Sequence, residues 1–248
     1  MDTYNKKDRH RMPKLTLLAA IAVFVCVGCS LEPMGRMSDV GRSTSQRRQG
    51  SVYLVRGLLG PFSMGMDKIC KDLQEQGVHA MVFQHTQEGE LADALAREYS
   101  ATRSAEPLVL IGHSLGADDV VEISRKLREQ NIRVTLMITI DPVMADPVPG
   151  NVVEAINFYR SNGVMDALPI FRGIPLKPGQ DADVHLLNYN LNNHQELLEP
   201  GTNHFTIDKN SRVRHAIVMQ VLEVCPAISN FAGVLPARVA APSDRAAK

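Results

Sequence analysis

The chain has 248 residues, of which 44% are hydrophobic, and this is enough apolar material for one sizeable buried core. Its 27 lysines and arginines balance its 27 aspartates and glutamates, so the charge gives no reason to expect a nucleic-acid partner. Tryptophan is absent and aromatic residues make up only 5%, which argues against a surface for stacking bases or sugars.

The first 29 residues have the pattern of an export signal. Basic residues are frequent up to Lys14, and an uncharged apolar run follows from Leu15 to Val27. The run is shorter than the roughly 20 residues that a membrane-spanning helix usually needs. It ends in VGCS at positions 27–30, which resembles a bacterial lipobox, although Cys26 stands where that pattern prefers leucine.

The lipobox resemblance implies that Cys29 receives lipid and becomes the mature N-terminus. The alternatives are an uncleaved single-pass anchor and a signal that is cut elsewhere. A lipid or an anchor predicts a membrane-attached protein of the cell envelope, with its domain facing the periplasm or the exterior.

The segments that flank the central part of the chain are poor in hydrophobic pattern. Residues 30–50 are rich in Ser, Gly, Arg and Met, which predicts a flexible tether. Residues 226–248 turn to Ala, Pro, Val and Arg, which predicts a disordered tail. Between them lie Cys70 and Cys225, which could pair in an oxidising compartment; two unpaired buried thiols are an equally good interpretation.

Residues 51–225 alternate between short apolar runs and amphipathic helical patterns, as expected of one domain. The predicted strands are 52–55, 80–83, 108–111, 133–140, 152–159 and 183–189. The predicted helices are 63–76, 88–99, 115–129 and 211–224, with Ser63 as the expected N-cap of the first. The alternation predicts an α/β fold with a doubly wound, mostly parallel sheet of about six strands and helices on both faces.

The third predicted strand runs directly into Gly112-His113-Ser114-Leu115-Gly116, and a helical pattern follows at once. The motif G-x-S-x-G between a strand and a helix is called a nucleophile elbow. A Cβ two residues before or after the serine would collide with the neighbouring strand or helix, so glycine is needed there. We therefore expect Ser114 Oγ to stand clear of the sheet edge. The alternative is a glycine-flanked serine that only caps a helix.

On this motif and its setting, the chain from about Ser51 to Val224 resembles the α/β-hydrolase superfamily. The resemblance implies a serine nucleophile followed along the chain by an acid and then a histidine. It also implies a minimal form of the fold, because no insertion is long enough to make a cap domain.

Two histidines lie in loops after the last predicted strand, in the region where the superfamily places its base. His204 lies in a glycine-bearing loop just before the final helix, and it is the favoured base; His194 is the alternative. His113 adjoins Ser114, so its side chain leaves the elbow in another direction and cannot easily accept the serine proton. His185 and His215 fall within a predicted strand and helix.

The favoured acid is Asp141, which closes the fourth predicted strand, because catalytic groups collect at the carboxyl ends of strands in open α/β sheets. Ile140-Asp141-Pro142 is similar to the Leu-Asp-Pro of pancreatic-type lipases, whose acid follows the strand after the serine. Many other members place the acid one strand later, where Asp166 lies. The remaining candidates are Asp146, Asp181 and Asp183.

An oxyanion hole needs two backbone N–H donors. We expect them at Leu115, which follows the serine, and at Leu58, which follows the first strand, with Leu59 as the next choice. The superfamily often has His-Gly before this second donor, and here the dipeptide is Arg56-Gly57. No cluster of His, Cys and Asp stands at metal-ligand spacing, so neither a metal nor another cofactor is expected.

These features predict a serine hydrolase that cleaves an ester of a small molecule or lipid through an acyl-enzyme, as carboxylesterases and lipases do. The apolar segment 163–180 is the candidate contact for an acyl chain. An amidase or a thioesterase would use the same three residues. A membrane-tethered binding protein without activity could share the fold, but it would have a broken triad or a collapsed pocket.

Overall fold

A computed structural model of the chain describes residues 35–41, 46–58, 63–102, 105–161, 173–180 and 182–228. The predicted signal segment, with Cys29, lies outside these ranges, as do Leu59, Asp166 and Asp181. All of these described residues belong to one compact unit. Within the described ranges, no helix has both the length and the apolar character needed to cross a membrane.

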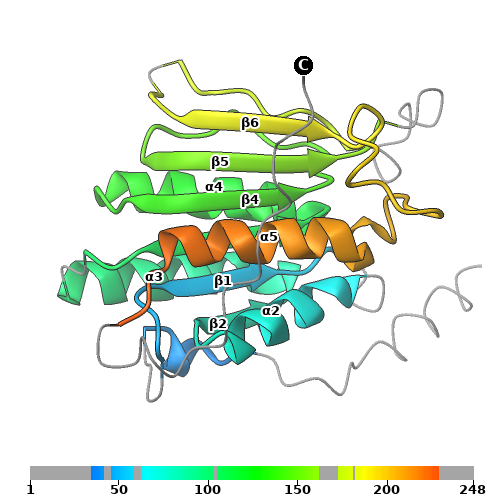
Figure 1. The fold of residues 1–248 in the computed structure, drawn as a ribbon. Coiled ribbons are helices and arrows are strands. Elements are labelled where there is room, and N and C mark those ends of the chain that lie inside the picture. The colour runs from blue at the N-terminus through cyan, green and yellow to red at the C-terminus, as the bar shows by residue number, and fades with distance from the viewer. Residues whose placement is uncertain are drawn as a thin grey trace, which may run out of the picture. The chain divides into compact units, whose positions relative to one another are not determined.

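Six strands form one sheet, in the order β2-β1-β3-β4-β5-β6, and every neighbouring pair is parallel (Figure 1). The strands are β1 (Ser51–Val55), β2 (His79–Phe83), β3 (Leu108–His113), β4 (Val134–Ile140), β5 (Val152–Tyr159) and β6 (His185–Asn190). The predicted doubly wound sheet is therefore confirmed. The strand order reverses between β1 and β3, which is where ligands bind in folds of this kind.

In the described ranges, four α-helices cover both faces of the sheet. They are α2 (Gly65–Glu75), α3 (Glu88–Thr102), α4 (Leu115–Glu129) and α5 (Ser211–Val224), and the short 3-10 helices are η1 (Met37–Asp39), η3 (His85–Gln87) and η6 (Ile207–Lys209). Helices α2 and α5 lie on one face, and α3 and α4 lie on the other (Figure 1).

Each face of the sheet has its own hydrophobic core. Val52 and Leu54 of β1 pack on the side of α2 and α5, whereas Tyr53 and Val55 pack on the side of α3 and α4. Strands buried on both faces are apolar at nearly every position, which is why the sequence marks them as continuous apolar runs.

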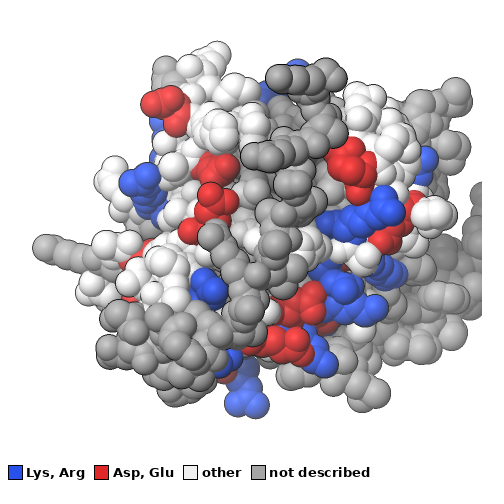
Figure 2. Space-filling model, in the orientation of Figure 1, with Lys and Arg blue, Asp and Glu red and all other residues white. Residues whose placement is uncertain are grey.

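The outer surface of α2 and α5 is polar. Acidic and basic side chains are interspersed on this face (Figure 2), and Arg214 of α5 pairs with Asp72 of α2 at 2.8 Å.

Ser63 differs from its predicted role as an N-cap. Helix α2 begins at Gly65, and its N-cap residue is Met64, which makes no side-chain hydrogen bond to the helix. The carboxyl group of Asp208 instead accepts the Gly65 N–H through Oδ2 at 2.9 Å. The Ser63 hydroxyl points into the site described below, because it bonds both Gly57 and His113.

The segments predicted as tether and tail contain residues that pack on the domain. The Gly35 N–H donates to the carbonyl of Val82 at 2.9 Å, and the Val40 side chain is buried. At the other end, Ala227 forms an antiparallel bridge with Arg48. Backbone hydrogen bonds and the buried side chain of Val40 thus hold parts of these segments on the domain. The polar composition of the segments does not reveal these contacts.

Cys70 on α2 and Cys225 after α5 belong to the same core, and both are free thiols in the structure. Burial raises the pKa of each thiol to about 12. Because the thiolate is the reactive form, neither cysteine is a candidate nucleophile in this state.

The glycines of the elbow are required by close backbone contacts. A Cβ on Gly112 would lie 2.0 Å from the carbonyl oxygen of Gly116, and a Cβ on Gly116 would lie 2.3 Å from that of Val55. Helix α4 therefore starts in contact with its own strand and with β1, as the motif predicts.

This contact generates a stability prediction. Gly116→Ala should cost at least about 4 kcal/mol in unfolding free energy or prevent folding, because its Cβ meets backbone that cannot move aside. Gly89→Ala in α3 is the matched control: its Cβ would meet nothing within 4 Å, and it should stabilise the protein by about 0.5–1 kcal/mol. Urea unfolding of both variants checks this, and equal stability of the two would contradict it.

Candidate active site

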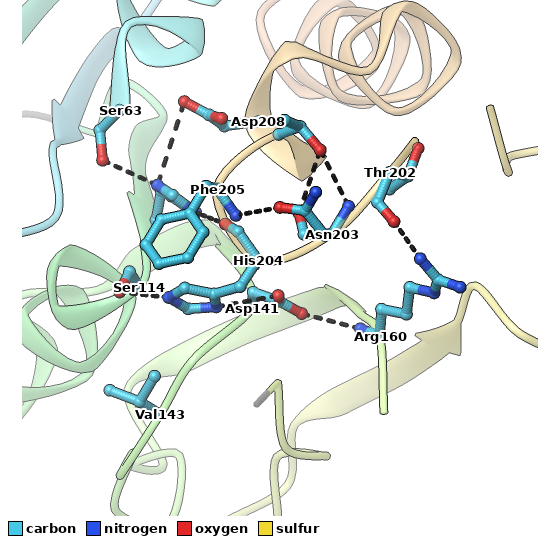
Figure 3. Close-up of polar contacts among 12 residues, drawn as sticks. Ser63, Ser114, Asp141, Val143, Arg160, Thr202, Asn203, His204, Phe205 and Asp208 are labelled. Atoms are coloured by element: carbon cyan, nitrogen blue, oxygen red, sulfur yellow. Dashed lines mark hydrogen bonds and ion pairs between the residues drawn. The ribbon is translucent and has the colours of Figure 1, made fainter. Parts of the chain in front are cut away.

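The candidate site lies at the carboxyl ends of β3, β4 and β5, next to the loop that precedes α5 (Figure 3). Ser114 stands between β3 and α4 with φ +58° and ψ −123°, a backbone conformation that non-glycine residues rarely adopt. Such strained conformations persist where the surrounding contacts enforce them. Here the two flanking glycines allow the contacts that do so.

Ser114, His204 and Asp141 form a continuous hydrogen-bonded chain (Figure 3). The Ser114 Oγ lies 2.9 Å from Nε2 of His204, and Nδ1 of His204 lies 3.0 Å from Oδ2 of Asp141. A carboxylate only accepts hydrogen bonds, so Nδ1 carries the proton and the lone pair of Nε2 faces the serine hydroxyl. This is the geometry that activates a serine nucleophile.

The Asp141 carboxylate is completely buried and has a second donor. Its Oδ1 accepts the backbone N–H of Arg160 at 2.7 Å, at the end of the neighbouring strand β5. Gly173 packs so closely that a Cβ there would lie 2.0 Å from the same oxygen. The N–H groups of His204 and Arg160 and the close packing of Gly173 thus fix the orientation of the Asp141 carboxylate.

The loop that carries His204 is held by its own hydrogen bonds and by β5. Gly201 has φ +82°, and the Thr206 hydroxyl donates to its carbonyl at 2.8 Å. Asn203 Oδ1 accepts the Phe205 N–H at 2.9 Å, and the Arg160 guanidinium donates to the carbonyl of Thr202. The loop therefore has a defined shape on both sides of the histidine.

The alternative base and acids are engaged elsewhere or lie outside the described residues. His194 is bonded to Glu196 at 2.8 Å, and Asp146 pairs with Arg125 at 3.2 Å. Asp183 is exposed. Among the described candidates, the structure places only Asp141 against the ring of His204.

The two predicted oxyanion donors lie on segments that flank the serine. Leu115 is the first residue of α4, where backbone N–H groups have no partner within the helix. A Cβ on Gly57 would lie 3.0 Å from that of Ser114, so the loop after β1 touches the nucleophile. The Gly57 N–H already donates to Ser63 Oγ at 3.0 Å, which leaves the N–H of Leu58 as the prediction for the second donor.

Arg56 stands at the position where the superfamily often has histidine, and its side chain reaches α2. Its side chain is fully buried and pairs with Asp67 of α2. It therefore fastens the loop after β1 to α2.

Three apolar side chains lie on loops at the same edge of the sheet as Ser114. Leu58 and Met144 are 61% and 62% exposed and belong to the loops after β1 and β4. The ring of Phe205 lies edge-on against that of His204, with 5.5 Å between centroids. Asp118 of α4 shapes one of these loops, because its carboxylate accepts the N–H groups of Val143 and Met144.

No group of three His, Cys, Asp or Glu side chains that could hold a metal ion occurs in the part of the chain that the structure describes.

Sequence reasoning missed a second set of polar groups behind the triad. His113 is buried and contacts both Ser63 and the backbone of His204, and Asp208 lies 4.0 Å from it. Burial, together with the nearby His204, lowers the pKa of His113 to about 4. Burial raises the pKa of Asp208 to about 7. At neutral pH these two groups are therefore not an ion pair. No pattern in the sequence marks them as neighbours, because His113 ends β3 and Asp208 lies in η6, far along the chain.

No protein-family model and no curated protein matches the chain. Solved structures do resemble it. An arylesterase has 12% identity and a TM-score of 0.48, with 86% of this chain and 91% of the other covered. A protein assigned to the α/β superfamily of hydrolases, from Xanthomonas campestris pv. campestris, has 14% identity and a TM-score of 0.42, over 70% of this chain and 99% of the other. A thioesterase of prodiginine biosynthesis from Streptomyces coelicolor has 11% identity and a TM-score of 0.42, over 88% and 98%.

The raised pKa of Asp208 predicts how the unfolding free energy depends on pH. The folded carboxyl keeps its proton up to about pH 7, whereas in the unfolded chain it ionises near 3.8. Between these values the folded state binds more protons, so this group lowers the unfolding free energy as pH rises, by up to about 4 kcal/mol. The unfolding free energy of Asp208→Asn should not fall in this way as pH rises. Urea unfolding of the variant and the wild type from pH 4 to 8 measures the difference.

The exposed Asp183→Asn serves as the control for the change in net charge. It should follow the wild-type pH dependence. The interpretation of Asp208 is contradicted if both variants follow the wild-type curve.

Proposed function

We propose that this protein is a serine hydrolase that cleaves esters through an acyl-enzyme. The observation that carries the proposal is the hydrogen-bonded chain from Ser114 through His204 to the buried Asp141, at a strained strand-to-helix turn. Each distance is that of a formed hydrogen bond. The chain order of serine, acid and histidine fits the resemblance noted in the sequence.

In the proposed mechanism, Ser114 Oγ attacks the acyl carbonyl while Nε2 of His204 takes its proton. Asp141 holds the imidazole in the correct tautomer and stabilises its charged form. The N–H groups of Leu58 and Leu115 receive the negative oxygen of the tetrahedral intermediate. His204 then protonates the leaving alcohol, and it activates the water that releases the acid.

The surroundings of the serine favour an apolar acyl group. Leu58 and Met144 expose more than half of their side chains on either side of the nucleophile's strand, and Phe205 adjoins the base. An exposed leucine and methionine beside a nucleophile can bury against the substrate and so contribute binding energy. Esters with an apolar acyl group are therefore the proposed substrate class, with thioesters and amides as the comparisons in a substrate panel.

The proposed location is the cell envelope, with the domain attached to the membrane through Cys29. The support is the basic segment up to Lys14, the apolar run 15–27 and the lipobox-like VGCS. An apolar ester of the envelope would then be within reach of the domain.

Loss of the nucleophile should abolish activity without unfolding the protein. Ser114→Ala should lower kcat/KM on p-nitrophenyl butyrate at least about 10⁴-fold and eliminate labelling by a fluorophosphonate probe. Asp141→Asn should fold and lose about 10⁴-fold, because His204 would adopt the wrong tautomer. Asp183→Asn, an exposed aspartate, is the matched control and should keep full activity.

Full activity of folded Ser114→Ala would refute the mechanism. A wild-type protein that neither turns over esters nor takes up the probe would instead support a binding role on the same fold.

Lipidation of Cys29 is tested separately. Cells that express the full chain with labelled palmitate should yield a labelled protein in the membrane fraction, and Cys29→Ala should lose the label. Cys70→Ala is the matched control and should retain it. Membrane attachment of unlabelled Cys29→Ala would favour the uncleaved anchor.

A further inference from the structure

His113 precedes Ser114 in the chain, and both of its ring nitrogens make hydrogen bonds to residues outside the triad side chains. Nδ1 lies 2.8 Å from the Ser63 hydroxyl, and Nε2 lies 2.9 Å from the backbone carbonyl of His204. The side chain is 2% exposed, so water does not compete for these bonds. The residue that the sequence excludes as a base thus touches the backbone of the base itself.

The partners of His113 determine its tautomer. A carbonyl oxygen only accepts hydrogen bonds, so Nε2 must carry a proton toward His204. The ring is neutral at pH 7, because burial disfavours its charged form. Nδ1 is then an acceptor and accepts a hydrogen bond from the Ser63 hydroxyl, while Ser63 Oγ in turn accepts the Gly57 N–H at 3.0 Å.

These bonds form one directed chain: Gly57 N–H to Ser63, Ser63 O–H to His113, and His113 N–H to the His204 carbonyl. One end of the chain is the loop after β1, next to the predicted oxyanion donor Leu58. The other end is the base. Arg160 holds the same loop from the opposite side through Thr202, so the backbone of His204 is anchored on both sides.

The neutral state of His113 also suits the charge that develops during the reaction. The rings of His113 and His204 are 5.5 Å apart between centroids. His204 becomes positively charged when it takes the serine proton, and a second positive charge at this distance would oppose that step. Asp208, 4.0 Å from Nδ1, is the nearest carboxyl to His113, and Lys209 follows it in the chain.

We propose that His113 is a positioning residue which, as its Nε2–H tautomer, sets the base His204 and the oxyanion loop relative to Ser114 through Ser63. The inference rests on the proposed hydrolase function. It assigns a role to the second residue of G-x-S-x-G that neither the motif nor the triad requires.

Three substitutions separate the two bonds of the ring. His113→Phe keeps a ring and removes both bonds, His113→Gln keeps a donor near Nε2, and His113→Asn keeps a polar group near Nδ1 alone. With p-nitrophenyl butyrate we expect Phe and Asn to lower kcat about 30- to 100-fold with KM within about 2-fold, because small misplacements of a base are costly. Gln should recover to within about 5-fold of wild type.

Exposed His185→Phe is the matched control and should leave both constants unchanged. If His113→Phe does not fold, Ser63→Ala carries the test, since it removes only the bridging hydroxyl; it should lower kcat about 10-fold. A folded His113→Phe or Ser63→Ala with wild-type kcat would overturn the proposal, as would Gln no better than Phe.

A measurement without turnover separates this inference from the proposed function. Long-range ¹⁵N–¹H spectra of histidine-labelled protein at pH 7 should show His113 as the Nε2–H tautomer, and Ser63→Ala should change its Nδ1 shift. A charged ring or an Nδ1–H tautomer would refute the chain of bonds even in an active enzyme. An inactive wild-type protein with the expected tautomer would refute the hydrolase function and leave the bonds standing.

Discussion

The contact between the first turn of α4 and the backbone of β1 is the constraint on which the site depends. Gly116 lies against the carbonyl of Val55, and Gly112 lies against that of Gly116, so the chain passes from strand to helix within one residue. That passage imposes φ +58° on Ser114 and directs its hydroxyl away from the sheet. The contact of Gly116 with Val55 also keeps α4 close to β1, so the loop after β1 lies next to Ser114. A side chain at either glycine would therefore separate Ser114 from the predicted oxyanion donors as well as destabilise the fold.

Burial determines what each polar group near the serine can do. Asp141 has no exposed surface, and it receives N–H donors at both oxygens, from His204 and from Arg160. Asp208 is equally buried, but Gly65 supplies a donor to Oδ2 while Oδ1 is buried without a hydrogen bond in the described structure. Desolvation therefore raises the pKa of Asp208 to about 7. The two aspartates thus suit different tasks: Asp141 holds the imidazole of His204, and Asp208 accepts the first N–H of α2.

The sequence predicts what depends on local pattern and leaves out what depends on distant contacts. The bounds of α4, β5 and α5 agree with the prediction, because strong periodicity or a continuous apolar run marks them. Ser63 has the residue type of an N-cap, yet its hydroxyl bonds His113, 50 positions away, and no local signal distinguishes the two uses. Arg160 illustrates the same limit, since its place beside Asp141 follows from the pairing of β4 with β5. Ser114, Asp141 and His204 could be named in advance only because a motif and a chain order mark them.

The position of the acid after β4 has a consequence for the whole site. Neighbouring strands lie about 4.8 Å apart. An acid directly after β5 would therefore lie about 4.8 Å further from Ser114 than an acid after β4, and only a longer loop could bring its carboxylate back to the imidazole. Here the end of β5 carries Arg160, whose N–H supports Asp141 and whose guanidinium holds Thr202, two residues before the base. Strand β5 therefore does not carry the acid; the residue that follows it, Arg160, supports Asp141 and the loop of His204 instead. His113 supplies the matching support from β3, on the other side of His204. The loop of His204, the proposed base, is thus held through its backbone by His113 of β3 and by Arg160 after β5. The ring of His204 bonds Ser114 after β3 and Asp141 after β4.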